Sequence, residues 1–251
     1  MKNLLTLTLA AALFATVCSG CGESSVAGAM DKGISRAAAG DWSGARKFSQ
    51  RALELDPENT DALIFHAIVC SRLGEHDPAL DAARRAAERA PESFLAQYLV
   101  GKLYSETPGR SGPALVALHK ACRLDPNNTD ARICLINAAM DLKAPQAEGY
   151  IQQLRRFPGF ENAPELLNQL GVIRFRRGDF SGARSCFVTA FRNDPERRNP
   201  AILFNVAYDF DRQAATRDKS RAFYQEFIRR AAGKAKFSKA LDFARQRLNG
   251  R

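Results

Sequence analysis

The chain contains the stretch Gly40-Asp-Trp-Ser-Gly-Ala-Arg-Lys-Phe-Ser-Gln-Arg-Ala-Leu-Glu-Leu-Asp-Pro57, and the skeleton of this stretch recurs along the sequence. The skeleton is a glycine, an alanine five residues later, a second alanine seven residues after the first, and a proline five residues further on. It returns at 74–91 and at 178–195. Pro57, Pro91 and Pro126 stand 34 and 35 residues apart. A fixed period of this length predicts an array of similar, stacked supersecondary units.

Each copy is expected to be a hairpin of two antiparallel helices, because small residues recur where the helix faces would cross. The glycine allows a left-handed cap that ends the first helix, and the proline ends the second. Helix formers dominate the composition and strand-like alternation is absent, so the predicted fold class is all-α. A single hairpin cannot bury its apolar face, so neighbouring hairpins must stack. The residues expected at the crossings are Ala45, Ala52, Ala79, Ala86, Ala114, Ala121, Ala183 and Ala190.

This pattern, with Leu170-Gly171 in the expected first helix of a later copy, resembles the tetratricopeptide repeat. The resemblance implies a right-handed αα-hairpin solenoid of about six repeats, spanning 28–231, with a C-terminal capping helix at 232–251. The fourth repeat is predicted to be irregular and to bend the array, because it lacks the turn glycine and contains Pro145 and Pro158. The repeats are expected at about 26–59, 60–93, 94–128, 129–163, 164–197 and 198–231.

The N-terminus has the pattern of a secretory signal peptide at residues 1–20, with a short basic segment before an apolar run. Its ending, Ser19-Gly20-Cys21, resembles the lipobox of bacterial lipoproteins. That resemblance implies cleavage before Cys21, acyl chains on this cysteine, and a lipidated tether at 21–27. The alternative is an ordinary cleaved signal with two incidental cysteines. Since Gly22 rather than aspartate follows the cysteine, the resemblance also implies an outer-membrane lipoprotein that faces the periplasm.

Charge is distributed unevenly along a chain whose net charge is +10. Residues 174–251 contain 19 Lys or Arg against 8 Asp or Glu, whereas the rest of the chain sums to −1. This cationic end is expected either to meet anionic headgroups, acidic envelope polymers or an acidic protein, or to be a solvated face that keeps the array soluble. Nucleic acid is disfavoured for an exported protein. The predicted basic patch consists of Arg217, Lys219, Arg221, Arg229, Arg230, Lys234 and Lys236.

Residues that carry catalytic chemistry are scarce and scattered. His66, His76 and His119 are far apart in the repeat register, and no nucleophile, phosphate-loop or metal-ligand motif occurs. Cys122 and Cys134 flank a predicted turn, which leaves open either a disulfide or two core thiols. Cys70 and Cys186 are expected to be small core residues. The chain is therefore predicted not to be an enzyme and to use no metal or cofactor.

A groove for a partner is implied by the family resemblance. In tetratricopeptide arrays the first helix of each hairpin lines the concave surface at its second, fifth, ninth, twelfth and thirteenth positions. Carried onto this chain, these positions imply an apolar groove for an extended peptide or a helix, with Asn137 and Asn168 bonding its backbone. The groove residues are Ile64, Ile68, Arg72, Leu95, Tyr98, Lys102, Ile133, Asn137, Met140, Asn168, Val172, Phe175, Arg176, Ile202, Val206 and Phe210.

The family's carboxylate clamp for chaperone C-termini is incomplete, because Ile133 stands where a lysine is needed beside Asn137. The leading hypothesis is a non-enzymatic scaffold or adaptor in the cell envelope whose partners are other envelope proteins. Its plan resembles that of repeat-containing outer-membrane lipoproteins such as the type IV pilus pilotins. The alternatives are a structural tether that holds anionic material at its cationic end, and an accessory part of a degradative or transport system.

Overall fold

The computed structural model describes residues 24–250, apart from the side chain of Ala214. Within this part of the chain the secondary structure is entirely helical, which confirms the predicted all-α fold class. The described helices fall into two compact units that divide between Leu142 and Lys143. None of these helices has both the length and the apolar character needed to cross a membrane.

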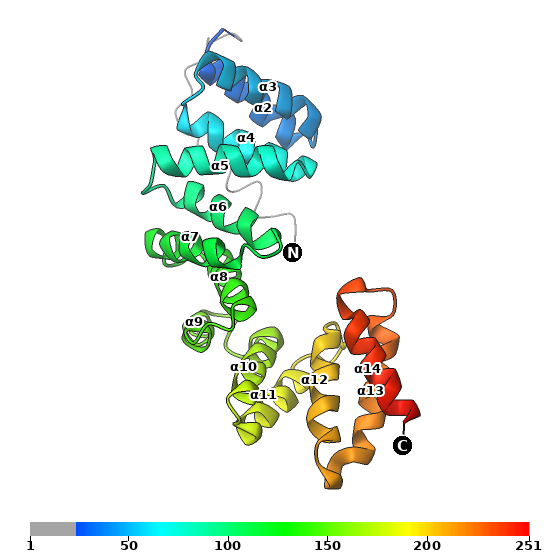
Figure 1. Ribbon diagram of the computed structural model, residues 1–251. Helices are drawn as coiled ribbons and strands as arrows, with labels where there is room; N and C mark the ends of the chain where they lie inside the picture. Colours follow the sequence, from blue (N-terminus) through cyan, green and yellow to red (C-terminus); the bar gives the residue numbers. More distant parts are fainter. Residues whose placement is uncertain (1–23, 251) are drawn as a thin grey trace. The chain divides into compact units, whose positions relative to one another are not determined.

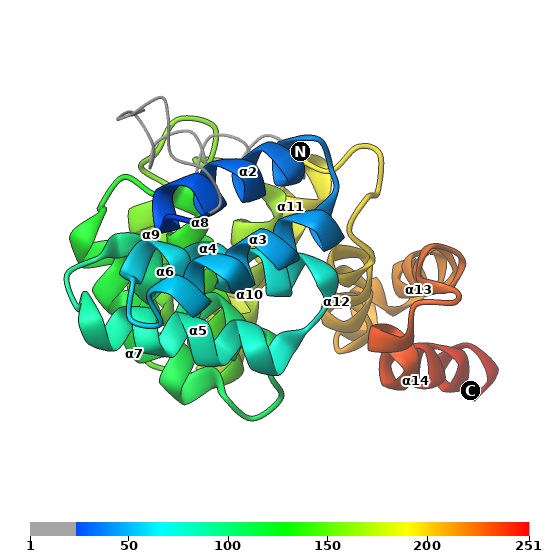
Figure 2. The same ribbon diagram turned by 90° about the horizontal axis from the view of Figure 1, so that it is seen from above.

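The first unit contains three antiparallel helix pairs followed by a single helix (Figures 1 and 2). Each pair packs closely together, and each also packs on the next helix along the chain. The helices are α2 (Val26–Ala38), α3 (Trp42–Leu55), α4 (Thr60–Leu73), α5 (His76–Arg89), α6 (Phe94–Glu106), α7 (Ser111–Leu124) and α8 (Thr129–Asp141).

The second unit begins with a short helix and continues with two long hairpins and a terminal helix. Its α-helices are α9 (Ala147–Leu154), α10 (Pro164–Arg176), α11 (Phe180–Arg192), α12 (Pro200–Asp211), α13 (Arg217–Ala231) and α14 (Ser238–Asn249). Two 3-10 turns, η1 (Ala214–Thr216) and η2 (Ala235–Phe237), precede α13 and α14. Helix α14 packs on α13 through Leu241 and Ala244, as a capping helix does.

One observed boundary, the start of the first described helix, differs from the predicted one. The signal peptide and Cys21 lie outside the described residues, but α2 already includes residues 26–27, which were predicted as tether. The fourth predicted repeat is irregular, since α9 has only 8 residues where the other repeats have a full second helix. The unit boundary falls inside this repeat, and the predicted bend stays a prediction.

Helix packing within the hairpins depends on small residues. All eight alanines predicted at the helix crossings are 0% exposed, four pairs in four hairpins. The turn glycines Gly40, Gly74 and Gly178 have φ values of 80°, 77° and 85°, a left-handed conformation that a side chain disfavours. Asn59 caps the start of α4 by accepting a hydrogen bond from the Ala62 N–H at 3.0 Å.

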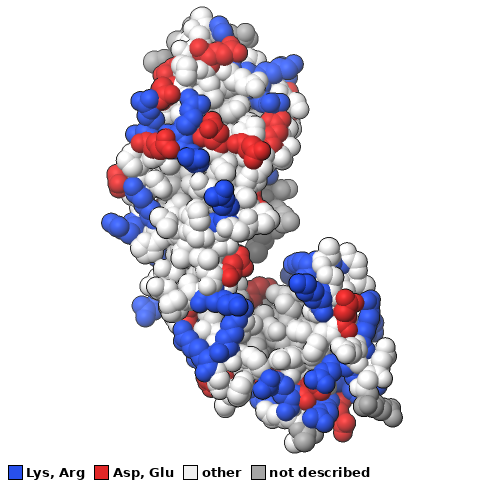
Figure 3. Space-filling model, viewed as in Figure 1, with Lys and Arg blue, Asp and Glu red and all other residues white. Residues whose placement is uncertain are grey.

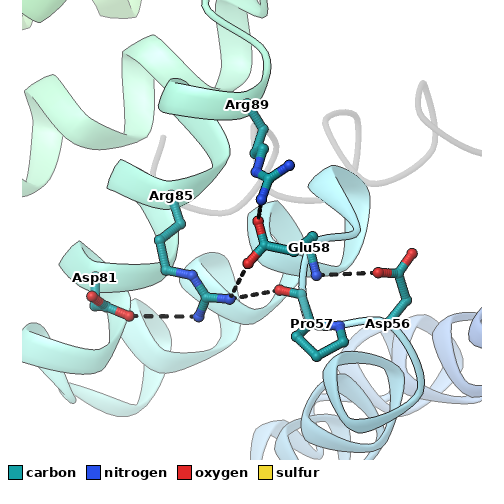
Figure 4. A network of polar contacts seen from close by, with 6 residues as sticks. All are labelled: Asp56, Pro57, Glu58, Asp81, Arg85 and Arg89. Carbon is teal, nitrogen blue, oxygen red and sulfur yellow. Dashed lines mark hydrogen bonds and ion pairs between the residues drawn. The ribbon is translucent and has the colours of Figure 1, made fainter.

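Neighbouring repeats are also joined by polar contacts at the inter-repeat turn (Figure 4). Arg85 on α5 donates to the Pro57 carbonyl at 2.6 Å and pairs with Glu58, which Arg89 also contacts. One repeat further on, Lys120 pairs with Glu92 at 3.2 Å, at the equivalent positions. Each of these exposed pairs contributes little to the free energy of unfolding, but together they link the second helix of a repeat to the turn that precedes the repeat.

Candidate peptide-binding groove

A concave site lies in the second unit, between the first helices of its two long hairpins. A shallow pocket of about 180 Å³ opens between α10 and α12, and one residue of α11 also lines it. Its lining is mainly aromatic and apolar, with one amide and one guanidinium group. The lining residues are Val172, Phe175, Arg176, Phe187, Phe204, Asn205 and Tyr208.

Helix α10 is placed in register with the expected repeat. Pro164 stands in its first turn, where a missing N–H costs nothing, and its Gly171 lies against the Phe187 ring. A Cβ at residue 171 would approach Phe187 Cε1 to 2.5 Å, so the helix can come this close only with glycine. Val172, Phe175 and Arg176, three of the predicted groove residues, consequently line the pocket.

Helix α12 presents a different face from the one predicted. Ile202 and Val206 are each only 1% exposed and pack, with Phe210, against the core shared by α10, α11 and α13. Ile202 and Val206 were predicted to face a ligand but are core residues, whereas Phe210 is only half-buried and its predicted contact with a ligand stays a prediction. The residues of α12 that line the pocket, Phe204, Asn205 and Tyr208, were missed.

The cause is a longer linker before α12. In the turn before α4 the helix cap Asn59 follows Asp56 by three residues, whereas before α12 the cap Asn199 follows Asp194 by five. Asp194 accepts hydrogen bonds from the backbone N–H groups of Arg198 and Asn199, at 2.9 and 3.1 Å, which orders the extra residues. Two residues correspond to about 200° of helix rotation, enough to exchange the buried face for the exposed one. In the sequence, Asn199-Pro200 indicates this later start, because a capping asparagine followed by proline is typical of the first turn of a helix.

Asn168 also differs from its predicted role. It is buried, and its side-chain oxygen accepts a hydrogen bond from Asn205 Nδ2 at 2.8 Å. It therefore positions Asn205 at the pocket.

The pocket rings belong to a longer chain of aromatic contacts. Phe175 packs edge-on against Phe180 and Tyr208, with centroid distances of 5.1 and 5.6 Å. Tyr208 stacks on Phe204, and both also contact Phe243 of α14. Each such contact favours a particular orientation of the neighbouring ring, so the rings of the pocket wall support one another.

In the first unit, the predicted groove residues are only partly accessible. Ile64, Leu95 and Tyr98 are buried, and Tyr98 stacks on Phe94 at 5.7 Å, so these three are core residues and not a contact surface. Arg72 lies over the Trp42 ring at 5.3 Å, and Lys102 pairs with Glu106 at 2.9 Å. The others, half-buried or exposed, are Ile68, Ile133, Asn137 and Met140.

The predicted basic patch is exposed but partly neutralised. Arg229 and Arg230 both pair with Glu226, and Arg217 lies 3.9 Å from Asp211. Of the described residues, 143–250 contain 21 Lys or Arg against 11 Asp or Glu, and 24–142 contain 14 against 15. On the visible face, the second unit is correspondingly richer in basic side chains (Figure 3). The patch residues for which no ion pair is formed with a described residue are Lys219, Arg221, Lys234 and Lys236.

His66 is part of a buried network with Ser49 and Cys70. Ser49, itself 0% exposed, donates to the Arg46 carbonyl at 2.9 Å, so His66 Nδ1 donates to Ser49 Oγ and Nε2 accepts from the Cys70 thiol at 3.4 Å. Burial, with Arg46 nearby, lowers the pKa of His66, and burial raises the pKa of Cys70 to about 11. Both groups are therefore neutral at pH 7 and serve as core contacts.

The remaining cysteines are free thiols in the structure, and burial raises the pKa of Cys122 to about 11. Across residues 24–250, no group of three or more His, Cys, Asp or Glu side chains is arranged to hold a metal ion.

Comparison with known proteins agrees with this architecture. Residues 36–103 match the model of the tetratricopeptide repeat family. Pseudomonas aeruginosa PilF is 18% identical, with 87% of this chain and 97% of that one covered and a TM-score of 0.63. YrrB, described as a TPR protein with an unusual peptide-binding site, is 22% identical, with 78% of this chain and 97% of that one covered and a TM-score of 0.59. MamA of AMB-1 is 21% identical, with 68% of this chain and 92% of that one covered and a TM-score of 0.62. No curated protein matches the sequence.

The fold is thus an array of tetratricopeptide-type hairpins with a capping helix, as predicted. Arrays of this class present extended surfaces for binding other proteins. The second unit has a pocket between the first helices of two successive hairpins of this kind.

Proposed function

We propose that this protein is a non-enzymatic scaffold or adaptor of the bacterial cell envelope, which binds a segment of a partner protein through the groove face of its second unit. The observation that carries the proposal is the aromatic pocket between α10 and α12. An apolar side chain of a partner would be buried there, while Asn205 and backbone groups hold the segment in place. The envelope setting rests on the lipobox-like ending Ser19-Gly20-Cys21 of the N-terminal segment.

Anchoring is part of the same proposal. Acylation of Cys21 would hold the protein on the periplasmic face of the outer membrane. Two or more acyl chains give firm attachment, because each buried methylene contributes about 0.8 kcal/mol.

The anchor is tested by replacing Cys21 with serine. Labelled palmitate is expected to enter the wild-type protein and to be absent from Cys21→Ser, which should move from the membrane fraction to the soluble fraction. Cys18→Ser is the matched control and should keep both the label and the membrane attachment. Equal labelling of Cys21→Ser and wild type would refute the anchor.

A second candidate function is a tether in which the cationic end holds anionic envelope material. The exposed side chains of Lys219, Arg221 and Lys234, which have no ion-pair partner among the described residues, favour it. Such binding would be weakened strongly by salt, because exposed charges are screened within about 10 Å at 0.1 M ionic strength.

Crosslinking in intact cells separates the two candidates. In Phe175→Ser/Tyr208→Ser we expect the intensity of the crosslinked partner bands to fall at least about tenfold, since both rings supply apolar contact area. The charge variant Lys219→Gln/Arg221→Gln/Lys234→Gln is expected to keep them. Circular dichroism should show unchanged helix content in both variants. Loss of the bands in the charge variant alone would replace groove binding by the tether.

A further inference from the structure

The pocket between α10 and α12 is bordered by positive charge that no described carboxylate neutralises. Arg176 lines the pocket and is exposed, and none of the other lining residues is acidic. Arg212, one residue beyond α12, lies over the rings of Phe175 and Phe180 at 5.2 and 5.0 Å. Neither arginine forms an ion pair within the described residues, although many other arginines of the second unit do.

Stacking holds the Arg212 guanidinium in place without using its hydrogen bonds. A guanidinium that lies on an aromatic face keeps its in-plane N–H groups available, and these match the two oxygens of a carboxylate. An arginine positioned beforehand loses less conformational entropy when it binds. The rings of Phe175 and Phe180 therefore prepare Arg212 to accept an acidic group beside the pocket.

The pocket is of a size for one side chain. Sites for free small ligands usually enclose about 300–1,000 Å³, and this pocket has about 180 Å³. Beside it, Asn205 is oriented by its hydrogen bond to Asn168, which uses Nδ2 and leaves the side-chain oxygen as an acceptor for a peptide N–H. An apolar side chain, a peptide backbone and flanking carboxylates would each meet a suitable partner.

We propose that the occupant is an acidic peptide segment of a partner protein, with one large apolar residue in the pocket and carboxylates paired with Arg176 and Arg212. This inference rests on the proposed groove function and adds its specificity. Residues 143–250 contain 21 basic and 11 acidic residues, and this excess of positive charge would also speed the encounter with such a segment.

Selection from a random peptide library tests this specificity. The full-length protein, in detergent, is immobilised and panned with a phage library, and enriched peptides are synthesised for affinity measurement. We expect the enriched peptides to share one aromatic or large aliphatic residue with Asp or Glu on either side. Their affinity should fall at least about tenfold for Arg176→Ala/Arg212→Ala, since hydrogen bonds between charged groups are the strong ones.

The matched control is Arg192→Ala/Arg221→Ala, which removes the same charge from exposed positions outside the pocket. It should lower the affinity much less. An equal loss in both variants would assign the effect to the general field of the unit and overturn the site. Peptides that depend on Phe175 and Tyr208 but carry no carboxylates would overturn the acidic specificity and leave groove binding intact. If no enriched peptide depends on Phe175 and Tyr208, both the groove function and the specificity fail.

Discussion

Replacing Phe227 by alanine is expected to lower the unfolding free energy of the second unit by about 3–5 kcal/mol. The side chain is 0% exposed, and its ring contacts Phe204 and Phe237 at centroid distances of 5.2 and 5.8 Å. Truncation loses the transfer free energy of the ring and leaves a cavity that helical neighbours fill only in part. Thermal and urea unfolding, followed by circular dichroism, measure the change.

Gln225→Ala is the control for this substitution, because Gln225 is exposed on the same helix. It should change stability by no more than about 0.5 kcal/mol. A loss below about 1 kcal/mol for Phe227→Ala would mean that the aromatic cluster does not hold the unit together.

Gly101→Val is expected to destabilise the first unit by about 3 kcal/mol, since overpacking a close helix crossing forces the backbone to move. A Cβ at residue 101 would lie 2.5 Å from Leu118 Cγ and 3.0 Å from the Leu118 backbone nitrogen. The side chain of Leu118 can change rotamer, but its backbone belongs to α7 and cannot. The midpoint of urea unfolding should fall accordingly.

Lys102→Val introduces the same residue one position further along α6, where the side chain is half-buried, and should cost about 1 kcal/mol or less. In Gly101→Val/Leu118→Ala the loss of stability should be smaller than the sum of the losses in the two single variants, because the smaller residue 118 relieves part of the clash. Additive losses in the double variant would show that the contact between α6 and α7 is not the cause.

The sequence was sufficient to predict the hairpins because their determinants are local and repeated. Ala45 and Ala52 lie at a crossing for the same reason as Ala79 and Ala86, and one period serves every copy. Gly74 could be assigned to a turn from its position alone, since only glycine adopts its φ of 77° without strain.

The ligand-facing side of α12 could not be predicted in the same way. Periodicity identifies an apolar stripe, but α12 has apolar residues on both faces: Ile202 and Val206 in the core, Phe204 and Tyr208 at the pocket. Which face turns inward depends on where the helix starts, and therefore on a linker whose length departs from the repeat. Arg212 was missed for the same reason, because the thirteenth position counted from the observed start of α12 at Pro200 is Arg212 and not Phe210.

The basic patch illustrates a different limit. Counting charges along the sequence located the cationic end, but it could not reveal that Glu226 engages two of the arginines. Pairing depends on side chains one helical turn apart meeting on the same face.

The capping helix has a consequence for recognition. Phe243 of α14 touches Phe204 and Tyr208, the same rings that form a wall of the pocket. The last helix of the described chain thus supports the rings that would contact a ligand, and it also buries the apolar face of α13. Substitutions in α14 that never meet a partner would still reshape the surface that the partner sees.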